Sequence, residues 1–594
     1  MNHDITQVQY PLEEKWERLR EALAEAPTPE PTGFTREIYL DIAERIIRTA
    51  VPWQDETGTI IDPYKGEETN SCTARFVGTL GQLIAAGRCH DLIDACVAGY
   101  EACLLRLDEV PSSPEFWTKE LMYAYRALEG KIPDSQLDRW KSAWEDHDPR
   151  KCYRCTVDNL TVNTVVFALA GEFFKHRNGL TQDNEIVDRL MSTQQDLFTS
   201  HGMYRDPNDP ITYDLVVRQQ LDLIRSYGYE GRLLPWLEET SRRGALTALL
   251  YQSSVGQVPF GGRSNQFHFV DAHFACMCES QARFYAAKGD FLMAGVFKRA
   301  GRRAVSLTVP WIMEFEPYHH TKQGFDPSLQ HGVDSGGFYS IYGILMGSLC
   351  GTAYHLADDD IEERLTPAEL GGYVFDLWPA FHKVFATCSG YHLEIDTNAD
   401  LKKDATGLGR FHRLGVRPET ALSGSIATEA DYTFAFDKPL HNLAIGPAWT
   451  HGDGVEYRLA DMDENEDVSL DIVDETVERL EFRITYQINK SSCKSITELY
   501  RLDANGLRYS VSVYPKPSRL CILIPAITTD GDVSSTEQVT ASGFEITYRD
   551  SVYRIRTEGD IHFRKDPPSA NRNAFYKTLE VSSDALSLEL HPLS

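Results

Sequence analysis

The chain has 594 residues, 42% of them hydrophobic, so it is too long for one ordinary core and two or more folded domains are expected. Its formal net charge of −29 at pH 7 argues against nucleic acid and membranes as partners, because both are anionic and would repel it. The N-terminus lacks a basic segment followed by an apolar one, and no long apolar run occurs elsewhere, so we expect a cytoplasmic protein.

The first part of the chain, to about residue 357, has apolar residues at three- and four-residue spacing, which predicts an array of helices. Such an array without an evident sequence repeat is compatible with an α-solenoid or with a closed α/α toroid. We favour the toroid, because the polar clusters fall in the connections between helices, as they would if every second connection opened into one central funnel. The expected helices are 35–50, 71–86, 91–107, 114–128, 159–176, 185–199, 212–227, 231–251, 267–288, 291–308 and 338–356.

From about residue 365 the pattern changes to alternating and β-rich runs joined by turn signals, which predicts an antiparallel β-sandwich. The expected fold class is therefore α+β multidomain, with an N-terminal α/α toroid followed by a C-terminal antiparallel β-sandwich. We expect a catalytic toroid over 1–365, a connecting segment over 366–415 and the sandwich over 416–594. Arg410 and His412 lie in a polar loop of the connecting segment, which either closes one side of a cleft or is a solvated linker.

The densest polar cluster is GQVPFGGRSNQFHFVDAHFACMCE, residues 256–279. Buried polar groups destabilise a fold unless they are paired, so their concentration beside an apolar run indicates a functional site. Ser264 or Asn265 is expected to cap a helix that begins near residue 266, where anions are favoured. A capping loop with core histidines is the alternative interpretation. The candidate site residues of this segment are Arg263, Asn265, Gln266, His268 and Asp271.

Two further loops and one helix start carry polar groups. HGMYRDPNDPITYD contains Tyr204 and Tyr213, which are candidates for sugar stacking or acid–base chemistry, although turn formation explains its aspartates. A later loop contains His319 and then His331 before a helix that starts with Tyr339, and His331 and Tyr339 are suited to act as base and acid. Core packing of the tyrosine is the alternative. Asn163 is a candidate for neutralising a substrate carboxylate.

Common cofactor and metal motifs are missing from the sequence. It contains no G-x-G-x-x-G after a predicted strand, no Walker loop, no G-x-S-x-G elbow and no H-E-x-x-H. Cys152 and Cys155 form one C-x-x-C without a second ligand pair, and most other cysteines lie in apolar surroundings typical of reduced core thiols. We therefore expect neither a cofactor nor a metal.

This layout, with Asn, His, Tyr and Arg in loops that face a cleft, resembles the toroid-plus-sandwich enzymes that act on uronic acid polysaccharides. These include the chondroitin AC, hyaluronate, alginate and heparinase-type lyases. More narrowly, GGRSNQFHFVDAHF is similar to a motif of bacterial relatives of rhamnose–glucuronate lyases and of exo-acting β-glucuronidases.

The lyase chemistry has three demands. The uronate carboxylate must be neutralised, a base must take the proton from C5, and an acid must protonate the leaving oxygen. The resemblance implies that Asn265 or Arg263 neutralises the carboxylate. It also implies that His268 or His331 is the base and that Tyr339 or Tyr204 is the acid. The full Asn-His-Tyr-Arg spacing of the chondroitin AC group is not matched.

Two other functions remain open at the sequence level. A glycoside hydrolase of the exo-β-glucuronidase type needs two carboxylates, for which Asp271 is the candidate within the motif. A non-catalytic glycan-binding protein is the third possibility. In each case the partner is a uronate-containing oligosaccharide or polysaccharide, and whether the chain forms a homo-oligomer stays open. The expected substrate-binding residues are Arg263, Asn265, Gln266, Asn163, Tyr213, His319, Arg410 and His412.

Overall fold

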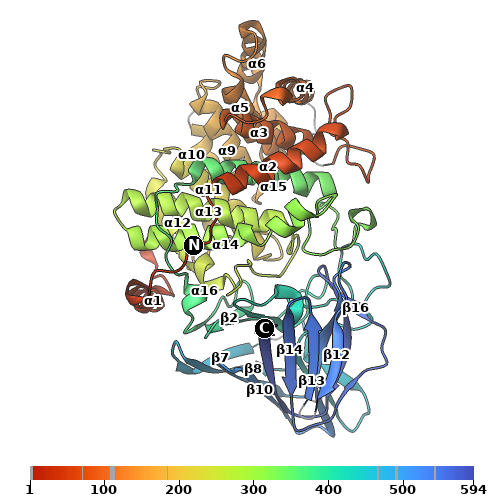
Figure 1. Cartoon of the computed structure of the whole chain (residues 1–594). Coiled ribbons are helices and arrows are strands. Elements are labelled where there is room, and N and C mark those ends of the chain that lie inside the picture. Colours follow the sequence, from red (N-terminus) through yellow and green to blue (C-terminus); the bar gives the residue numbers. More distant parts are fainter. Residues whose placement is uncertain are drawn as a thin grey trace. The chain divides into compact units, whose positions relative to one another are not determined.

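The computed structural model describes residues 5–69, 71–107, 114–183, 185–463, 467–488, 493–540 and 543–593. The chain divides into two compact units (Figure 1). The first, which we call the helical unit, consists of Met1–Ala248, Phe267–His320 and Gly336–Arg364. The second, which we call the β unit, consists of Leu249–Gln266, Thr321–Ser335 and Leu365–Ser594. The β unit therefore includes two segments from the helical half of the sequence.

Six of the described helices in the helical unit pack side by side in a closed ring, each against the next and the last against the first. They are α3 (Cys72–Ala85), α5 (Thr118–Leu128), α9 (Thr164–Arg177), α11 (Thr212–Ser226), α13 (His268–Ala287) and α15 (Tyr339–Leu356). Other helices pack against ring members: α2 (Glu37–Ala50) on α15 and α3, α4 (Ile93–Leu104) on α3 and α5, α10 (Glu185–Ser192) on α9 and α14 (Phe291–Ser306) on α13. This is the predicted α/α toroid.

In every neighbouring pair of ring helices, residues early in one helix contact residues early in the other, and late residues contact late residues. All six helices are therefore parallel. Their N-termini consequently lie at one end, which we call the N-terminal end of the ring. The contacting pairs are Gly78–Glu120 and Gly81–Ala124 for α3 and α5, Phe116–Phe167 and Tyr123–Phe174 for α5 and α9, Asn163–Asp206 and Phe174–Tyr227 for α9 and α11, Gln219–Cys276 and Asp222–Gln281 for α11 and α13, Phe269–Tyr342 and Cys276–Leu349 for α13 and α15, and Thr79–Gly347 and Gln82–Gly351 for α3 and α15.

The helices expected from apolar spacing all occur, with ends that differ by a few residues. Two of the described helices of eight residues or more were not among the expected ranges, α1 (Glu13–Glu25) and α6 (Asp134–Asp146). Both are strongly polar, and α6 is held mainly by two fully buried indoles, Trp140 and Trp144. A short apolar stripe of two large rings gives a weak periodic signal, which explains why α6 was missed.

The predicted capping of α13 is wrong. The helix starts at His268, and the residue before it makes no side-chain capping hydrogen bond. The Ser264 hydroxyl instead donates to Asp334 at 3.3 Å, and the Asn265 amide donates to the carbonyl of Gly262. Both side chains thus form hydrogen bonds within the β unit and do not cap the helix that follows.

All strand pairs of the described β unit are antiparallel. A four-stranded sheet is formed by β1 (Tyr373–Asp376), β2 (Lys383–Cys388), β3 (Tyr391–Asp396) and β4 (Gly407–Arg413) in that order. An eight-stranded sheet has the order β12 (Thr536–Thr540), β13 (Gly543–Tyr548), β14 (Ser551–Arg556), β18 (Ala585–Pro592), β10 (Gly506–Tyr514), β9 (Ser495–Asp503), β8 (Arg479–Gln487), β7 (Asp467–Glu475). A third sheet has the order β15 (Ile561–Phe563), β17 (Phe575–Val581), β11 (Arg519–Thr529), β5 (Gly446–Thr450), β6 (Glu456–Arg458), with β16 (Ser569–Ala570) beside β17.

The three sheets share one apolar core, to which β8, β9 and β10 contribute alternate residues and β11 contributes consecutive ones. The predicted antiparallel β-sandwich is therefore confirmed. The polar loop expected around Arg410 and His412 is in fact strand β4, which pairs with β3. Both side chains are fully buried in the β unit.

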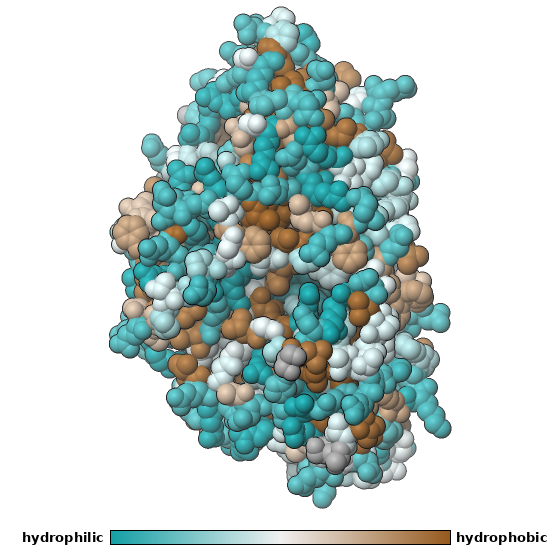
Figure 2. Space-filling model, viewed as in Figure 1, coloured by the Kyte–Doolittle hydropathy of each residue, from teal (hydrophilic) through white to brown (hydrophobic). Residues whose placement is uncertain are grey.

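The face of the molecule in Figure 2 is mostly hydrophilic, with small hydrophobic areas between the polar ones. Among the residues that the structure describes, no helix is long and apolar enough to cross a membrane.

Candidate functional site

The N-terminal end of the ring collects polar side chains from five of its helices. They are Arg75 on α3, Lys119 on α5, Tyr213 on α11, His273 on α13 and Tyr342 on α15. Electrostatic coupling links them: Tyr213 and Tyr342 both act on the pKa of Arg75, while Lys119 and Arg75 both act on the pKa of His273. We call these five residues the ring cluster.

Arg75 is the most unusual member of the ring cluster. It is only 6% exposed, and burial lowers its pKa, although a guanidinium stays charged at neutral pH. Its guanidinium makes no hydrogen bond or ion pair with another described residue. A buried unpaired charge destabilises a fold strongly, so this arrangement favours a role in binding an anion.

Lys119 differs from Arg75 because it has a fixed partner. Its ammonium lies 3.2 Å from a carboxylate oxygen of Glu120, and both side chains are buried. Glu120 also accepts a hydrogen bond of 2.6 Å from Ser348 on α15. Gly78 on α3 leaves room for this carboxylate, since a Cβ there would lie 2.3 Å from it. Glu120 is thus committed to two partners.

His273 is fully buried, and neither of its ring nitrogens has a hydrogen-bond partner among the described residues. Burial first, and then the positive charges of Lys119 and Arg75, hold the pKa of His273 well below its usual range. The imidazole is therefore neutral at pH 7 and has a nitrogen lone pair with which it can accept a proton.

The two tyrosines of the ring cluster, Tyr213 and Tyr342, are half-buried rather than buried. The ring of Tyr342 lies 4.3 Å from that of Phe269 and 4.8 Å from that of Phe267. A half-exposed tyrosine combines an apolar face with a hydroxyl, which suits contact with a sugar ring.

The ring geometry adds a positive potential to these side chains. Each helix N-terminus carries roughly half a positive charge from its unpaired backbone N–H groups. Because the six ring helices are parallel, these partial charges meet at one end, where anions are favoured. The site thus combines these partial charges and the cations Arg75 and Lys119 with the carboxylates of Glu120, Asp214 and Asp271, which lie in the first turns of the same helices.

Five residues predicted from the sequence lie at this end, in the first turn of a ring helix or directly before it. They are Asn163, Tyr213, His268, Asp271 and Tyr339. Their side chains differ in what they contact. The Asn163 amide donates to both carboxylate oxygens of Asp206 at 3.1 Å, and the Tyr339 hydroxyl donates to the Tyr318 carbonyl at 2.7 Å. His268 is buried, and its ring lies 6.3 Å from the indole of Trp311.

Two other predicted residues of the helical unit are held by packing. Tyr204 is fully buried, and its hydroxyl donates to Gln194 at 3.1 Å. His319 is buried against Phe315, with 4.4 Å between the ring centres. We do not include either among the groups that we propose to act on a substrate.

The remaining predicted residues belong to the β unit. Arg410 lies 3.1 Å from Glu394 and donates to the carbonyls of Val258 and Ser423. The ring of His412 lies between the hydroxyls of Ser253 and Ser423. These contacts satisfy both side chains within the β unit.

His331 and the glycine-rich loop are also part of the β unit. One ring nitrogen of His331 lies 2.9 Å from the Asn571 carbonyl, and burial lowers its pKa to about 4. The Gln266 amide donates to the Ser423 carbonyl at 3.0 Å, while Arg263 is half-buried. The motif that dominates the sequence is therefore divided: its loop belongs to the β unit, and the helix from His268 onward belongs to the helical unit.

Sequence reasoning did not select Arg75, Lys119, His273 or Tyr342 as site residues. A signal was present, since each is a polar or cationic residue within the first turns of an otherwise apolar predicted helix. A comparison of the first turns of all the predicted helices, made to find polar residues within otherwise apolar segments, would have identified them.

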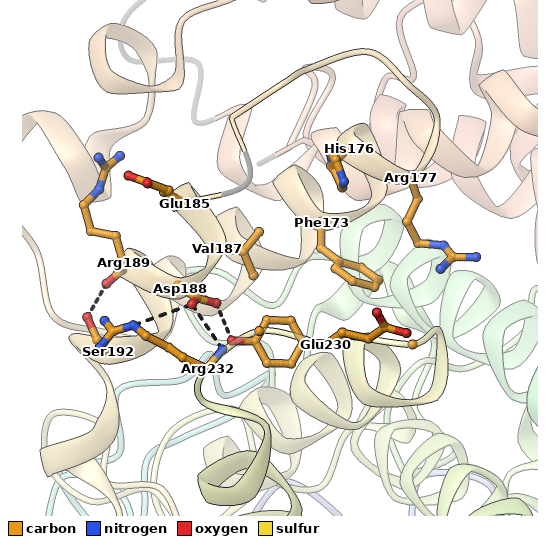
Figure 3. A pocket seen from close by; sticks show the side chains of 13 residues that line it. Phe173, His176, Arg177, Glu185, Val187, Asp188, Arg189, Ser192, Glu230 and Arg232 are labelled. Carbon is orange, nitrogen blue, oxygen red and sulfur yellow. Dashed lines mark hydrogen bonds and ion pairs between the residues drawn. The ribbon is translucent and has the colours of Figure 1, made fainter.

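Another hollow of the helical unit lies elsewhere (Figure 3). It has a volume of about 1010 Å³ and is lined by residues at the C-terminal end of α9 and after α11, among them Phe173, Arg177, Tyr229 and Arg232. Arg232 lies 3.5 Å from Asp188, to which the Tyr229 hydroxyl also donates. None of the predicted site residues lines this pocket, which is near the other end of the ring.

Among the described residues, no group of three His, Cys, Asp or Glu side chains could hold a metal ion. The cysteines, including Cys152 and Cys155, are buried and form no disulfide bonds.

No protein-family model matches the chain, and no curated protein matches it. A solved structure of chondroitinase AC lyase with oligosaccharides is similar over 93% of this chain and 81% of its own, with 10% identity and a TM-score of 0.43. An unsaturated glucuronyl hydrolase from Streptococcus agalactiae is similar over 58% of this chain and 96% of its own, with 11% identity and a TM-score of 0.38. Chondroitinase AC lyase is one of the enzymes whose layout the sequence resembles, but at these identities and TM-scores the likeness does not extend to a reaction.

Proposed function

We propose that this chain is a carbohydrate-active enzyme that cleaves uronate-containing oligosaccharides or polysaccharides by β-elimination at the N-terminal end of the ring. The observation that carries the proposal is the buried Arg75 guanidinium, which has no described hydrogen-bond or ion-pair partner and lies among parallel helix N-termini. Such a site favours the binding of one anionic group. His273, Tyr213 and Tyr342 of the ring cluster are the nearby groups that we propose for proton transfer.

In this mechanism Arg75 binds the C6 carboxylate of the uronate. Neutralising that carboxylate makes the C5 proton more acidic, because negative charge that develops during proton removal is stabilised by the fixed cation. A guanidinium is well suited to the task, since it can bind a carboxylate through two parallel hydrogen bonds. Lys119 adds positive potential nearby while it stays paired with Glu120.

His273 is the proposed base. Its neutral ring takes the proton from C5, the C4–O bond breaks, and a C4=C5 double bond forms in the product. Tyr342 or Tyr213 donates a proton to the leaving oxygen. The low pKa of His273 keeps the imidazole unprotonated before the reaction, and binding of the uronate anion next to it favours the protonated form afterwards.

The test is to incubate the protein with glucuronate-containing oligosaccharides and to follow both new reducing ends and the ultraviolet absorbance of the C4=C5 double bond. Elimination produces the two signals in equal amounts. Reducing ends without the absorbance would identify a hydrolase, for which Asp271 in the first turn of α13 is the candidate carboxylate. Binding without either signal would identify a glycan-binding protein. Both outcomes contradict the proposal.

A further inference from the structure

The eight-stranded sheet of the β unit carries a row of arginines on the face opposite its apolar core. Strand register places Arg501 on β9 directly opposite Arg508 on β10, Arg508 opposite Ser587 on β18, and Ser587 opposite Arg556 on β14. Residues that are paired across antiparallel strands point to the same face, so these four side chains form one line across four strands. We call Arg501, Arg508 and Arg556 the arginine row.

The arginine row lies in a hollow of the surface with a volume of about 510 Å³. The hollow arises because small side chains occupy the middle of this face: Ser510, Ala585 and Ser587 line it between the arginines. The adjacent residues of the same strands, such as Tyr509 and Leu588, are buried in the core. The arginine side chains therefore surround a shallow surface depression that is accessible to a ligand.

Each arginine has a carboxylate partner. Arg501 lies 3.0 Å from Glu481, and Arg556 lies 3.0 Å from Glu589. Arg508 donates to Asp503 at 2.6 Å. Each partner accepts from only one or two of the five N–H donors of a guanidinium, and the arginine side chains are 45%, 60% and 45% exposed in chain order. Glu558 is the other acidic residue that lines the hollow.

This arrangement is a poor way to stabilise a sheet. Like charges directly opposite each other on neighbouring strands are destabilising, and exposed ion pairs contribute little. Strands are roughly 4.8 Å apart, so Arg508 and Arg556 are separated by about 10 Å across β18. Two cations on neighbouring strands and a third about 10 Å away match a ligand that carries several negative charges along its length.

We propose that the arginine row binds a linear anionic oligosaccharide, which lies across the strands and is carboxylated or sulfated. The choice of a saccharide rests on the function proposed above. The arginine row would extend that function by binding part of a long substrate away from the bond that is cleaved. The described residues of the hollow argue against single-stranded nucleic acid, because Tyr509 is buried and the lining contains no other aromatic on which bases could stack.

The experiment measures binding of fluorescently labelled polyglucuronate, chondroitin sulfate, dextran and single-stranded DNA to the full chain. The wild type is expected to bind the anionic saccharides, with affinity that falls as salt is raised, and not to bind dextran. The double variant Arg508→Gln with Arg556→Gln is expected to bind at least about tenfold more weakly, which corresponds to about 1.4 kcal/mol. The two anionic saccharides show whether carboxylate or sulfate is preferred.

The matched control is Arg519→Gln on β11 of the third sheet, an arginine that is 47% exposed and paired with Glu456 and Glu580. It is expected to bind like the wild type. Equal binding by the double variant, equal weakening by the control, stronger binding of DNA than of saccharides, or no binding of any polyanion would overturn the inference. Cleavage of a short oligosaccharide is measured in parallel. If the protein cleaves it but binds no anionic polymer, the binding role of the arginine row is wrong and the proposed function stands. If the protein binds the polymer but cleaves nothing, the binding role stands and the proposed function is wrong.

Discussion

At the residue scale the central feature is Arg75, a buried cation with no hydrogen-bond or ion-pair partner among the described residues. The nearby Glu120 carboxylate raises the pKa of Arg75 but is paired with Lys119. Arg75 forms no ion pair with the described residues, so its burial at the N-terminal end of the ring is best explained by a ligand that supplies an anion. The same reasoning separates it from Lys119 and from Arg410, whose charges are already compensated by Glu120 and Glu394.

Arg75→Lys keeps a positive charge but removes the planar fork that binds a carboxylate. We expect kcat/KM for a glucuronate-containing oligosaccharide to fall by about 100- to 1000-fold, the usual cost of losing one such electrostatic contact. The midpoint of thermal unfolding should stay about the same, because one buried cation replaces another. Steady-state kinetics and a thermal melt check the two parts. Retained kcat/KM with a lowered melting temperature would mean that Arg75 is structural.

His273 sets the acidic side of the pH profile. A base acts only when unprotonated, and the pKa of His273 is held well below its usual range of about 6.5, so activity should stay constant as pH falls from 8 through 6.5. His273→Gln should lower kcat by about 100-fold or more. The profile of kcat/KM against pH is the measurement, and a fall in activity centred near 6.5 would contradict the assignment.

At the scale of elements, α3 and α5 approach closely because Gly78 has no side chain. A Cβ there would lie 2.3 Å from the Glu120 carboxylate and 2.9 Å from its Cα, so Gly78→Ala should destabilise the protein by about 1 to 3 kcal/mol through overpacking. Chemical unfolding measures the effect. The matched control is Gly452→Ala, since a Cβ at Gly452 meets nothing within 4 Å. Equal small effects from both changes would show that the contact is unimportant.

Buried carboxyls in the β unit predict a pH dependence of stability. Burial raises the pKa of Asp404, Glu419 and Glu498 to about 7 in each case. These groups bind protons more tightly in the folded state than in the unfolded state, whose pKa values are about 4, so their contribution to the free energy of unfolding should fall as pH rises from about 4 to 7.

The size of this change is about 1.4 kcal/mol for each unit by which a pKa is raised. Denaturant unfolding at pH 5 and pH 8 provides the measurement. Glu498, which accepts hydrogen bonds from Tyr486 and Tyr509, offers a direct check: Glu498→Gln should flatten part of the slope. Histidines with pKa values lowered by burial, such as His201 and His331, act in the opposite direction below about pH 6.5, so the comparison of the variant with the wild type is the test. An equal dependence of stability on pH in both proteins would contradict the expectation.

The elements themselves were largely predictable, and the site was not. Long helices such as α13 and α15 have an apolar pattern that extends over many turns, so their positions followed from the sequence. The ring cluster comes from helices that are far apart in the chain, and only closure of the ring brings Arg75 near His273. Similarly, the loop around Ser264 finds its partner in Asp334, which no local pattern indicates.

At the scale of the whole molecule, two features of opposite sign coexist. The chain has a net charge of −29, whereas the N-terminal end of the ring gathers Arg75, Lys119 and six helix N-termini. Local positive potential in an acidic protein favours a specific anionic ligand and disfavours general attraction to polyanions. This combination fits an enzyme for a uronate.

The most direct test of the account is to cleave a glucuronate-containing oligosaccharide in water enriched in oxygen-18 and to weigh the products by mass spectrometry. Elimination breaks the C4–O bond without using water. We therefore predict an unsaturated product that is lighter by one water molecule than the corresponding hydrolysis product, and we predict that no product contains heavy oxygen. Arg75→Lys should form this product about 100- to 1000-fold more slowly at low substrate concentration. Products that carry one heavy oxygen and have the mass of hydrolysed sugar would contradict the central claim.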